Sequence, residues 1–249
     1  MKRRLRSPGP IYVEIQMTAP IEEVWRRSQD PDDHSRWDLR FTRIELLPKA
    51  PASQGAPTPL RHFRYAVGPV TGVGATGAVR TLVDGSATSA LRFRSDHRFS
   101  PLRSGSGYWR YLPASGGAAG GTTFLTRYDY IPRGPADRVV RPLLGWATAW
   151  SFDRLRLWVD EGITPEQSRL RAVLELTARL TVGGAGLAVA GSGSGVVPGA
   201  LVGPVARIVL GGALLIAALV VRPHRLTPSA RRCRRHPDHP VRPAPEVLP

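Results

Sequence analysis

The 249-residue chain contains a single cysteine, Cys233, and only two lysines among its 35 basic residues. One cysteine cannot form an internal disulfide, which excludes a secreted scaffold held together by disulfides. The net charge of +16 is therefore carried almost wholly by arginine. A high-GC genome produces this bias without selection for phosphate binding, so we expect no specific nucleic-acid partner.

A continuous apolar run is also missing from the N-terminus, where the basic residues 1–6 lead directly into Pro8-Gly9-Pro10. A secretory signal needs an apolar core at this place. We therefore expect a basic segment at residues 1–10, followed by a domain at residues 11–163 that stays in the cytoplasm. The chain has 42% hydrophobic and 22% charged residues, a composition typical of globular proteins.

Hydrophobic periodicity predicts a strand, a short helix, six further strands and one long helix within residues 11–163. Ile11–Met17 alternates apolar and polar side chains and is expected to be the first strand. A helix follows from Pro20, carries two glutamates in its first turn, and ends before Asp30-Pro31. The other predicted strands are Thr42–Leu47, Arg61–Val67, Gly77–Val83, Ser89–Phe99, Gly107–Leu112 and Thr122–Ile131.

The period becomes helical over residues 136–161, and Gly162 ends that helix. Asp153 and Arg154 are expected on its solvent side. A sheet with one apolar face needs a cover, and this helix is the only predicted element long enough to supply it. The sequence predicts an α+β fold in which a curved antiparallel sheet wraps around the helix and leaves a cavity. The predicted apolar stripe consists of Val140, Leu143, Leu144, Ala147, Trp150, Leu155 and Trp158.

The run Ala19-Pro-Ile-Glu-Glu-Val-Trp25 after the first strand, then Asp30-Pro31 and Trp37, resembles the helix-grip fold of the SRPBCC group. This group includes START and Bet v 1-like proteins and polyketide cyclases. The resemblance covers about residues 11–162. It implies a binding protein for a hydrophobic small molecule or a lipid, without a cofactor. The alternative that it implies is a polyketide cyclase or aromatase of the same fold.

A narrower resemblance lies in Trp146–Trp158 and the following Glu161–Pro165. These residues look like bacterial proteins in which such a domain precedes a DoxX-like membrane region. The region that follows here is short and rich in glycine, so we do not expect a complete four-helix unit of that kind.

Several side chains are expected on the inward faces and could line the cavity. Each could equally be a core residue whose polar tip is satisfied internally. His97 and Tyr128 are the candidates for proton transfer in the enzyme alternative. No partner that would orient His97 as a general base can be identified. The candidate ligand-binding residues are Trp25, Tyr65, Phe93, His97, Tyr108, Phe124, Tyr128, Tyr130, Leu143, Trp146 and Trp150, with Trp109 as a further candidate.

Gly72-Val-Gly-Ala-Thr-Gly77 matches the dinucleotide-binding pattern G-x-G-x-x-G. That chemistry needs a helix N-terminus after the glycines to present backbone N–H groups to a pyrophosphate. Residues 78–83 have a strand pattern instead, so a glycine-rich hairpin is the better interpretation. Ser192 and Ser194 lack the G-x-S-x-G spacing and the preceding strand of a hydrolase nucleophile.

The C-terminal residues Cys233, His236, Asp238 and His239 have a spacing found in metal sites. A structural metal site needs four ligands within a folded frame, whereas these residues lie among arginines whose charge repels a cation. Since residues 224–249 also have too few apolar side chains to form a core, we expect a disordered tail and no metal.

Charge almost disappears after Arg179, because Arg207 is the only ionisable residue before Arg222. Residues 200–221 are long and apolar enough to span a bilayer, and about residues 176–197 are long enough but diluted by glycine. We predict a membrane-associated region at residues 164–223. The soluble alternative is an apolar helix hairpin packed on the domain.

Arginines flank the apolar region on both sides, and basic flanks favour the cytoplasm. Two spans place both basic flanks in the cytoplasm, whereas a single span would place one of them outside it. We therefore predict a hairpin in the cell membrane with the domain and the C-terminal tail both cytoplasmic. Its turn is expected near residues 191–195 or at Pro198-Gly199.

Overall fold

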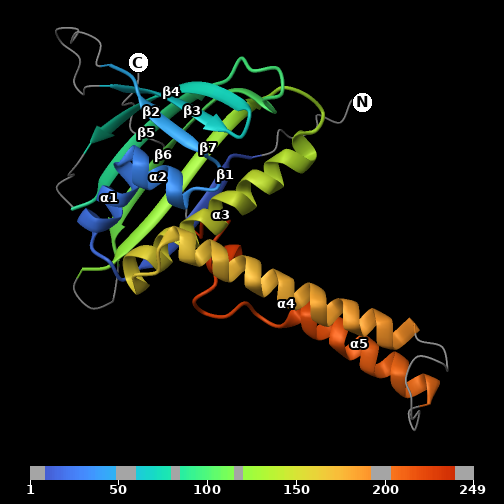
Figure 1. The fold of residues 1–249 in the computed structure, drawn as a ribbon. Helices are drawn as coiled ribbons and strands as arrows, with labels where there is room; N and C mark the ends of the chain where they lie inside the picture. Colours follow the sequence, from blue (N-terminus) through green and yellow to red (C-terminus); the bar gives the residue numbers. More distant parts are fainter. Residues whose placement is uncertain (1–8, 49–59, 80–84, 115–119, 192–202, 239–249) are drawn as a thin grey trace, which may run out of the picture. The chain divides into compact units, whose positions relative to one another are not determined.

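The computed structural model describes residues 9–48, 60–79, 85–114, 120–191 and 203–238 (Figure 1). The chain divides into two compact units, one made of Met1–Pro165 and Ser229–Pro249 and the other of Glu166–Pro228. The elements in chain order are β1 (Ile11–Met17), α1 (Ile21–Gln29), α2 (Pro31–Trp37), β2 (Arg43–Leu46), β3 (Arg61–Val67), β4 (Val70–Val79), β5 (Ala87–Arg94), β6 (Leu102–Pro113), β7 (Thr122–Pro132), α3 (Asp137–Glu161), α4 (Pro165–Gly191), α5 (Pro204–Val220) and the 3₁₀ turn η1 (Ala230–Arg232).

The seven strands form one antiparallel sheet in the order β1-β7-β6-β5-β4-β3-β2. Since successive side chains alternate between faces, Phe124 and Tyr128 of β7 share the inner face, while Leu125 lies on the outer one. Helix α3 packs against the sheet at β1 and covers its inner face (Figure 1). The predicted α+β helix-grip fold is therefore confirmed.

The core lies between α3 and the inner face of the sheet. Phe152 of α3 stacks on Phe124 of β7 with a ring-centroid distance of 4.4 Å, and both side chains are fully buried. Trp37, at the end of α2, is also fully buried beside Phe152. Each such side chain contributes about 1.5–3 kcal/mol by leaving water.

The predicted stripe of α3 is correct for Leu155 and Trp158, which are buried, but not for Leu143, which is 57% exposed. Thr148, Ala149 and Ser151 are fully buried, because small side chains let the helix approach the sheet closely. Asp153 and Arg154, expected in solvent, are buried as well. Arg154 donates hydrogen bonds of 2.9–3.1 Å to the backbone carbonyls of residues 36, 37 and 165, so its buried charge is satisfied.

Helix α2 was not predicted, since Asp30-Pro31 was interpreted as the end of the first helix. Asp30 is in fact the N-cap of a new helix, and its carboxylate accepts hydrogen bonds from the backbone N–H groups of Asp32 and Asp33. Pro31 occupies the first position of α2, where a missing N–H has no consequence.

The glycine-rich segment forms strand β4 and not the predicted hairpin loop. The turn lies earlier, at Gly68-Pro69, where Gly68 has a φ of 56°. Strand β5 ends at Arg94, earlier than predicted. Residues 80–84, which include the end of the predicted strand Gly77–Val83, lie outside the described residues.

The segment after the second unit returns to the sheet, and we call Ser229–Arg235 the C-terminal strap. Arg234 and Glu14 of β1 exchange two backbone hydrogen bonds of 2.9 Å. The thiol of Cys233 is buried and donates to the carbonyl of Ala149 at 3.1 Å. The predicted disorder is therefore wrong for the strap, because α3 and β1 supply the partners that its own composition lacks. Residues 239–249 lie outside the described residues.

The unit Glu166–Pro228 contains α4 and α5, which pack together. Arg179 of α4 donates hydrogen bonds of 2.8 Å and 2.7 Å to the carbonyls of Ala218 and Val221 at the C-terminal end of α5. Gly186 and Gly211 lie at the closest approach, where a Cβ on Gly211 would collide with the carbonyl oxygen of Gly186. Small residues allow this close packing of two apolar helices.

By length and composition, α4 is the one helix among the described residues that could cross a membrane, whereas α5 is apolar but shorter, with 17 residues. The sequence had suggested that the second stretch, residues 200–221, was the stronger candidate. Helix α5 begins only at Pro204, with Gly203 as its N-cap, and is therefore shorter than the predicted stretch. The glycines of α4 do not interrupt that helix. The expected turn after Gly191, with Ser192 and Ser194, lies outside the described residues.

Candidate ligand-binding site

A cavity of about 180 Å³ lies on the inner face of the sheet, beneath α3. Its wall is mostly aromatic and aliphatic, which is typical of sites for hydrophobic ligands. The main lining side chains are Phe63 and Tyr65 of β3, Leu91 and Phe93 of β5, Trp109 of β6, Tyr128 of β7, Leu144 of α3, and Phe41 from the connection between α2 and β2.

Glycines in the sheet make room for these rings. Gly74 pairs with Phe63, and Gly72 pairs with Tyr65; a Cβ on either glycine would collide with the ring of its partner. Strand β6 repeats the arrangement, since Gly105 and Gly107 give space to Phe93 and Tyr128. Gly72 and Gly74 of the G-x-G-x-x-G match therefore serve ring packing in a sheet, and the next element in the described part of the chain is strand β5 and not a helix.

One charged side chain, Arg40, is among the described residues that line the cavity. Its Nε and Nη2 donate to the two carboxylate oxygens of Asp38 at 2.9 Å and 2.6 Å. His34 Nε2 lies 3.1 Å from the same carboxylate. The guanidinium carbon of Arg40 is 5.4 Å from the centroid of the Tyr128 ring.

These buried groups shift one another's pKa values. Burial alone would raise the pKa of Asp38, but the charge of Arg40 and the hydrogen bonds from His34 and Arg40 hold it well below its usual range. Burial would lower the pKa of Arg40, but Asp38 raises it. Burial lowers the pKa of His34, only partly opposed by Asp38. At neutral pH the group is therefore an arginine–aspartate ion pair with a neutral histidine.

The hydroxyl groups at the cavity donate to acceptors within the protein. Thr148 donates to the carbonyl of Leu144 at 2.8 Å, so the 3.0 Å contact between Tyr128 and Thr148 is a hydrogen bond donated by Tyr128. Tyr65 donates to the carbonyl of Arg94 at 3.4 Å, and burial raises its pKa to about 12. Both hydroxyl groups thus donate their protons to acceptors within the protein.

Among the predicted site residues, Tyr65, Phe93 and Tyr128 line the cavity, together with Trp109. Tyr108 of β6 is also a lining residue of the cavity, but its side chain packs with Tyr12 on the outer face of the sheet. Tyr108 is one residue out of phase with Trp109, and alternation along a strand turns it away.

Other predicted residues belong to the core or to the end of the sheet. Phe124 is fully buried against Phe152, and Trp25 packs on Tyr111 with a ring-centroid distance of 4.9 Å. Tyr130 donates a hydrogen bond to Asp137 at the start of α3. Phe124 lies on the inner face of the sheet, as predicted, but Phe152 of α3 packs against it and leaves no space for a ligand.

His97 and the three predicted residues of α3 are not among the residues that line the cavity. Because β5 ends at Arg94, His97 lies in the following turn, where its Nδ1 accepts from the backbone N–H of Phe99 at 3.3 Å. Leu143 and Trp146 are 57% and 45% exposed, and Trp150 stacks on Trp146. On this part of α3 the lining residue is Leu144, the neighbour of Leu143 in the predicted stripe.

The predicted ligand-binding set did not include Arg40, Phe41, Phe63, Leu91 and Leu144, although Leu91 was expected on an inward face and Leu144 in the stripe of the helix. Phe63 and Leu91 share strand faces with Tyr65 and Phe93, so alternation could have identified them. Arg40 and Phe41 lie outside every predicted helix and strand, and no local pattern marks them as cavity residues.

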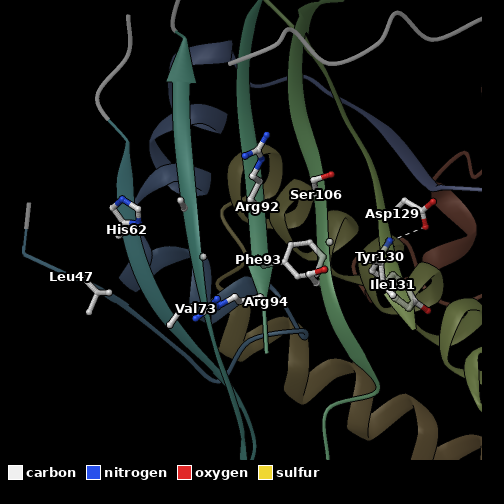
Figure 2. A pocket seen from close by; sticks show the side chains of 14 residues that line it. Leu47, His62, Val73, Arg92, Phe93, Arg94, Ser106, Asp129, Tyr130 and Ile131 are labelled. Atoms are coloured by element: carbon white, nitrogen blue, oxygen red, sulfur yellow. Dashed lines mark hydrogen bonds between the residues drawn. The ribbon is translucent and has the colours of Figure 1, made fainter. Parts of the chain in front are cut away.

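A second hollow of about 780 Å³ lies on the outer face of the sheet (Figure 2). Figure 2 shows charged side chains at its wall, among them Arg92 and Arg94 of β5 and Asp129 of β7. It is larger than the inner cavity, but it is wide open to solvent and would enclose little of an apolar ligand. We therefore take the inner cavity as the candidate site.

The described part of the chain contains no group of three or more histidine, cysteine, aspartate or glutamate side chains that could hold a metal ion. Of the metal-like residues in the sequence, Cys233 is buried within the C-terminal strap, where burial raises the pKa of its thiol. His239 lies outside the described residues.

A curved antiparallel sheet closed by a long helix, with an apolar cavity between them, defines a helix-grip protein. Residues 10–157 match the family described as polyketide cyclase / dehydrase and lipid transport, and the chain belongs to this family. The match covers more than half of the chain and includes every residue of the cavity wall.

A Bacillus subtilis (strain 168) protein named "Uncharacterized membrane protein YndG" is 40% identical over 172 residues. The aligned region covers 66% of this chain and 62% of that protein, so the chain spans less than two thirds of the relative's length. These matches do not support the resemblance to DoxX-containing proteins.

Solved structures with similar folds include the Zhui aromatase/cyclase from Streptomyces sp. R1128, with a TM-score of 0.37, 14% identity, and coverage of 61% of this chain and 98% of that one. Another is CV1439 from Chromobacterium violaceum, with a TM-score of 0.40, 19% identity, and coverage of 62% and 99%. At these scores the likeness carries no argument about function.

Proposed function

We propose that the protein binds a hydrophobic small molecule or a lipid in the cavity beneath α3, and that it does so at a membrane. The observation that carries this proposal is the wall of the cavity, which is aromatic and aliphatic apart from a few polar groups. Membership of a family described by cyclase, dehydrase and lipid-transport activities supports it.

The membrane part of the proposal rests on α4, which has the length and composition of a spanning helix and side chains largely exposed within the structure. The name of the Bacillus subtilis relative, a membrane protein, points the same way. Exposed apolar residues of α5, such as Ile208 and Leu219, also favour lipid as their surroundings.

Chain connectivity favours a hairpin over a single span. The unit that holds α4 and α5 is joined at both ends, after Pro165 and before Ser229, to the same compact unit. A single crossing would place the C-terminal strap on the opposite side of the membrane from its partners Asp153 and Glu14. The basic flanks, Arg169 and Arg171 on one side and Arg222 and Arg225 on the other, favour the cytoplasm for both ends.

Labelling of single cysteines in a Cys233→Ser background tests this topology. Cysteines at Ser194 and at Arg235, an exposed position of the strap, are treated with a membrane-impermeant maleimide in whole cells. The hairpin predicts labelling at residue 194 in intact cells and at residue 235 only after lysis. Labelling of residue 235 in intact cells, or release of the protein by alkaline carbonate, would overturn the hairpin.

The cyclase or aromatase alternative keeps the same cavity and assigns proton transfer to its polar groups. Tyr128 lies in the cavity, but His97 does not, so the geometry supplies fewer candidate acids and bases than the sequence suggested. Because Tyr128 donates its proton to Thr148, it could bind a substrate carbonyl only by exchanging that hydrogen bond for one to the substrate. Turnover that is lost in Tyr128→Phe, with unchanged ligand affinity, would favour the enzyme.

Mass spectrometry of organic extracts from the purified full chain tests binding directly. Leu144→Trp fills the cavity from α3, whereas Val139→Trp changes a 64%-exposed position of the same helix and is the matched control. We expect the amount of co-purified ligand to fall about tenfold in the first variant and to stay unchanged in the second. Folded protein without any apolar ligand, and without a thermal shift across a lipid panel, would overturn the proposal.

A further inference from the structure

We propose that the ligand carries a carboxylate, and that Arg40 binds it inside the cavity. This inference rests on the proposed function, since it names the polar group of the same ligand. It starts from the position of Arg40, the one charged side chain among the described residues that line the cavity.

The hydrogen bonds of Arg40 leave part of its guanidinium available. The group has five N–H donors in a planar fork. Asp38 accepts from Nε at 2.9 Å and from Nη2 at 2.6 Å, which uses the side edge of the fork. The hydroxyl oxygen of Tyr128 accepts a third hydrogen bond from the guanidinium. Two of the five N–H donors therefore remain for a ligand, and a carboxylate that takes both of them would lie beside the Tyr128 hydroxyl.

The neighbouring hydroxyl groups do not compete as donors to a ligand. Tyr128 donates to Thr148, and Ser100 donates to the carbonyl of Leu102 at 2.7 Å. Thr126 donates to the carbonyl of Tyr108 at 3.0 Å. With these protons engaged, the hydrogen bonds that the cavity wall can donate to a ligand come chiefly from Arg40. A ligand with an acceptor end therefore fits, whereas an ammonium end would meet a fixed positive charge.

The ion pair also holds the Arg40 guanidinium in one place, which fixes the position of the ligand carboxylate. Asp38 is 1% exposed and holds Arg40 by three hydrogen bonds, one of them to the Arg40 backbone N–H at 3.0 Å. The guanidinium thus needs no reordering when the ligand arrives. Apolar residues such as Leu91 and Phe93 would contact the remainder of the ligand. The expected ligand class is an apolar chain or ring system that ends in one carboxylate.

Three probes of equal length test the inference on the full chain in phosphatidylcholine nanodiscs: decanoate, decan-1-ol and decylamine. Affinities are measured by calorimetry, with empty nanodiscs subtracted. We expect decanoate to bind at least about tenfold more tightly than decylamine, as a charge-assisted hydrogen bond predicts. In Arg40→Met the preference for decanoate over decan-1-ol should fall by about tenfold or more.

Removal of Arg40 alone leaves Asp38 buried and unpaired, so Arg40→Met can lose its fold. The double variant Asp38→Asn/Arg40→Met removes the whole ion pair and is expected to fold and to show the same loss of preference. Arg94→Met, at a side chain that is 68% exposed on the outer face, is the matched control and should leave all three affinities unchanged.

The outcomes separate the two proposals. If all three probes bind the wild type equally, or if the folded double variant keeps the preference for decanoate, the inference is wrong while the cavity remains a ligand site. If Arg94→Met and not the double variant abolishes decanoate binding, the acid binds on the outer face and the inference is also wrong. If no probe binds the wild type, the proposed function itself fails.

Discussion

The carboxylate of Asp153 accepts a hydrogen bond of 2.7 Å from the backbone N–H of Ser229, 76 residues further along the chain. Asp153 is fully buried, and it also pairs with Arg156 at 2.7 Å and with Arg232 at 2.6 Å. This single side chain of α3 therefore attaches the C-terminal strap to the ligand-binding unit. The hydrogen bond joins the parts of the chain that precede α4 and follow α5.

Asp153→Ala should release the strap and destabilise the protein. The change removes the buried anion that pairs with Arg156 and Arg232, so we expect a loss of about 3–5 kcal/mol in the free energy of unfolding. Urea denaturation of the full chain measures this loss, and limited trypsin digestion should show faster cleavage at the strap arginines. Asp129→Asn, at a 54%-exposed side chain paired with Arg141, is the control and should change stability by less than about 1 kcal/mol. Equal effects of both variants would contradict this role.

Gly74→Ala should destabilise the sheet although alanine normally suits a strand better than glycine. A Cβ at this position would collide with the Phe63 ring, and it would lie 2.9 Å from the carbonyl oxygen of Arg92. We expect a loss of about 1–3 kcal/mol, as for other overpacked sites, together with weaker ligand binding as Phe63 moves into the cavity. Gly134→Ala has open space around its Cβ and serves as the control. A stabilised Gly74→Ala variant would show that the ring does not lie over this glycine.

Gly211→Leu should separate α4 from α5, whereas Gly212→Leu should not. The two glycines are neighbours in α5, but a Cβ on Gly211 collides with the Gly186 backbone and a Cβ on Gly212 meets open space. We expect the first variant to lose about 2 kcal/mol or more of helix-pair stability. Disulfide formation between cysteines introduced at Gly183 and Ala218 in a Cys233→Ser background reports on the pairing. Unchanged crosslinking in Gly211→Leu would disprove the packing.

The free energy of unfolding should decrease as the pH falls below about 6.5. The pKa of His34 is lowered by burial, so the unfolded chain takes up a proton that the folded chain excludes. The depressed pKa of Asp38 adds a second loss below about pH 4, where the unfolded carboxylate becomes protonated first. Urea denaturation between pH 7.5 and 3.5 measures both. His34→Asn should flatten the slope between about pH 6.5 and 5, whereas His62→Gln, at an exposed position of β3, should leave it unchanged.

Local patterns were sufficient for much of the architecture. Alternation in Ile11–Met17 and in Thr122–Ile131 identified two strands that pair with each other, and it placed Phe124 and Tyr128 on the inner face. The change from a period of two to a helical period near residue 136 located α3 to within one residue. Strand positions, strand faces and the start of α3 depend on residues close together in the chain, so the sequence alone was enough to predict them.

The ligand cavity was only partly predictable. Tyr65, Phe93 and Tyr128 were found because their strand faces follow from alternation. Leu143 and Trp146 were assigned to the cavity because large apolar side chains normally mark the buried side of a helix. The buried face of α3 also includes Thr148, Ala149 and Ser151, whose small side chains do not mark a buried face in the sequence.

The sequence by itself determined the order of the elements, the two faces of each strand, and the presence of apolar helices after residue 164. Only the tertiary structure decided the rest: the ion pair of Arg40 and Asp38 at the cavity, the rings over Gly72 and Gly74, and the strap held by Asp153. The rings and the strap depend on groups that meet across strands or across 76 residues of chain. Arg40 and Asp38 are only two residues apart, but their burial at the cavity comes from elements packed around them. Composition and periodicity record neither the burial nor the distant partners.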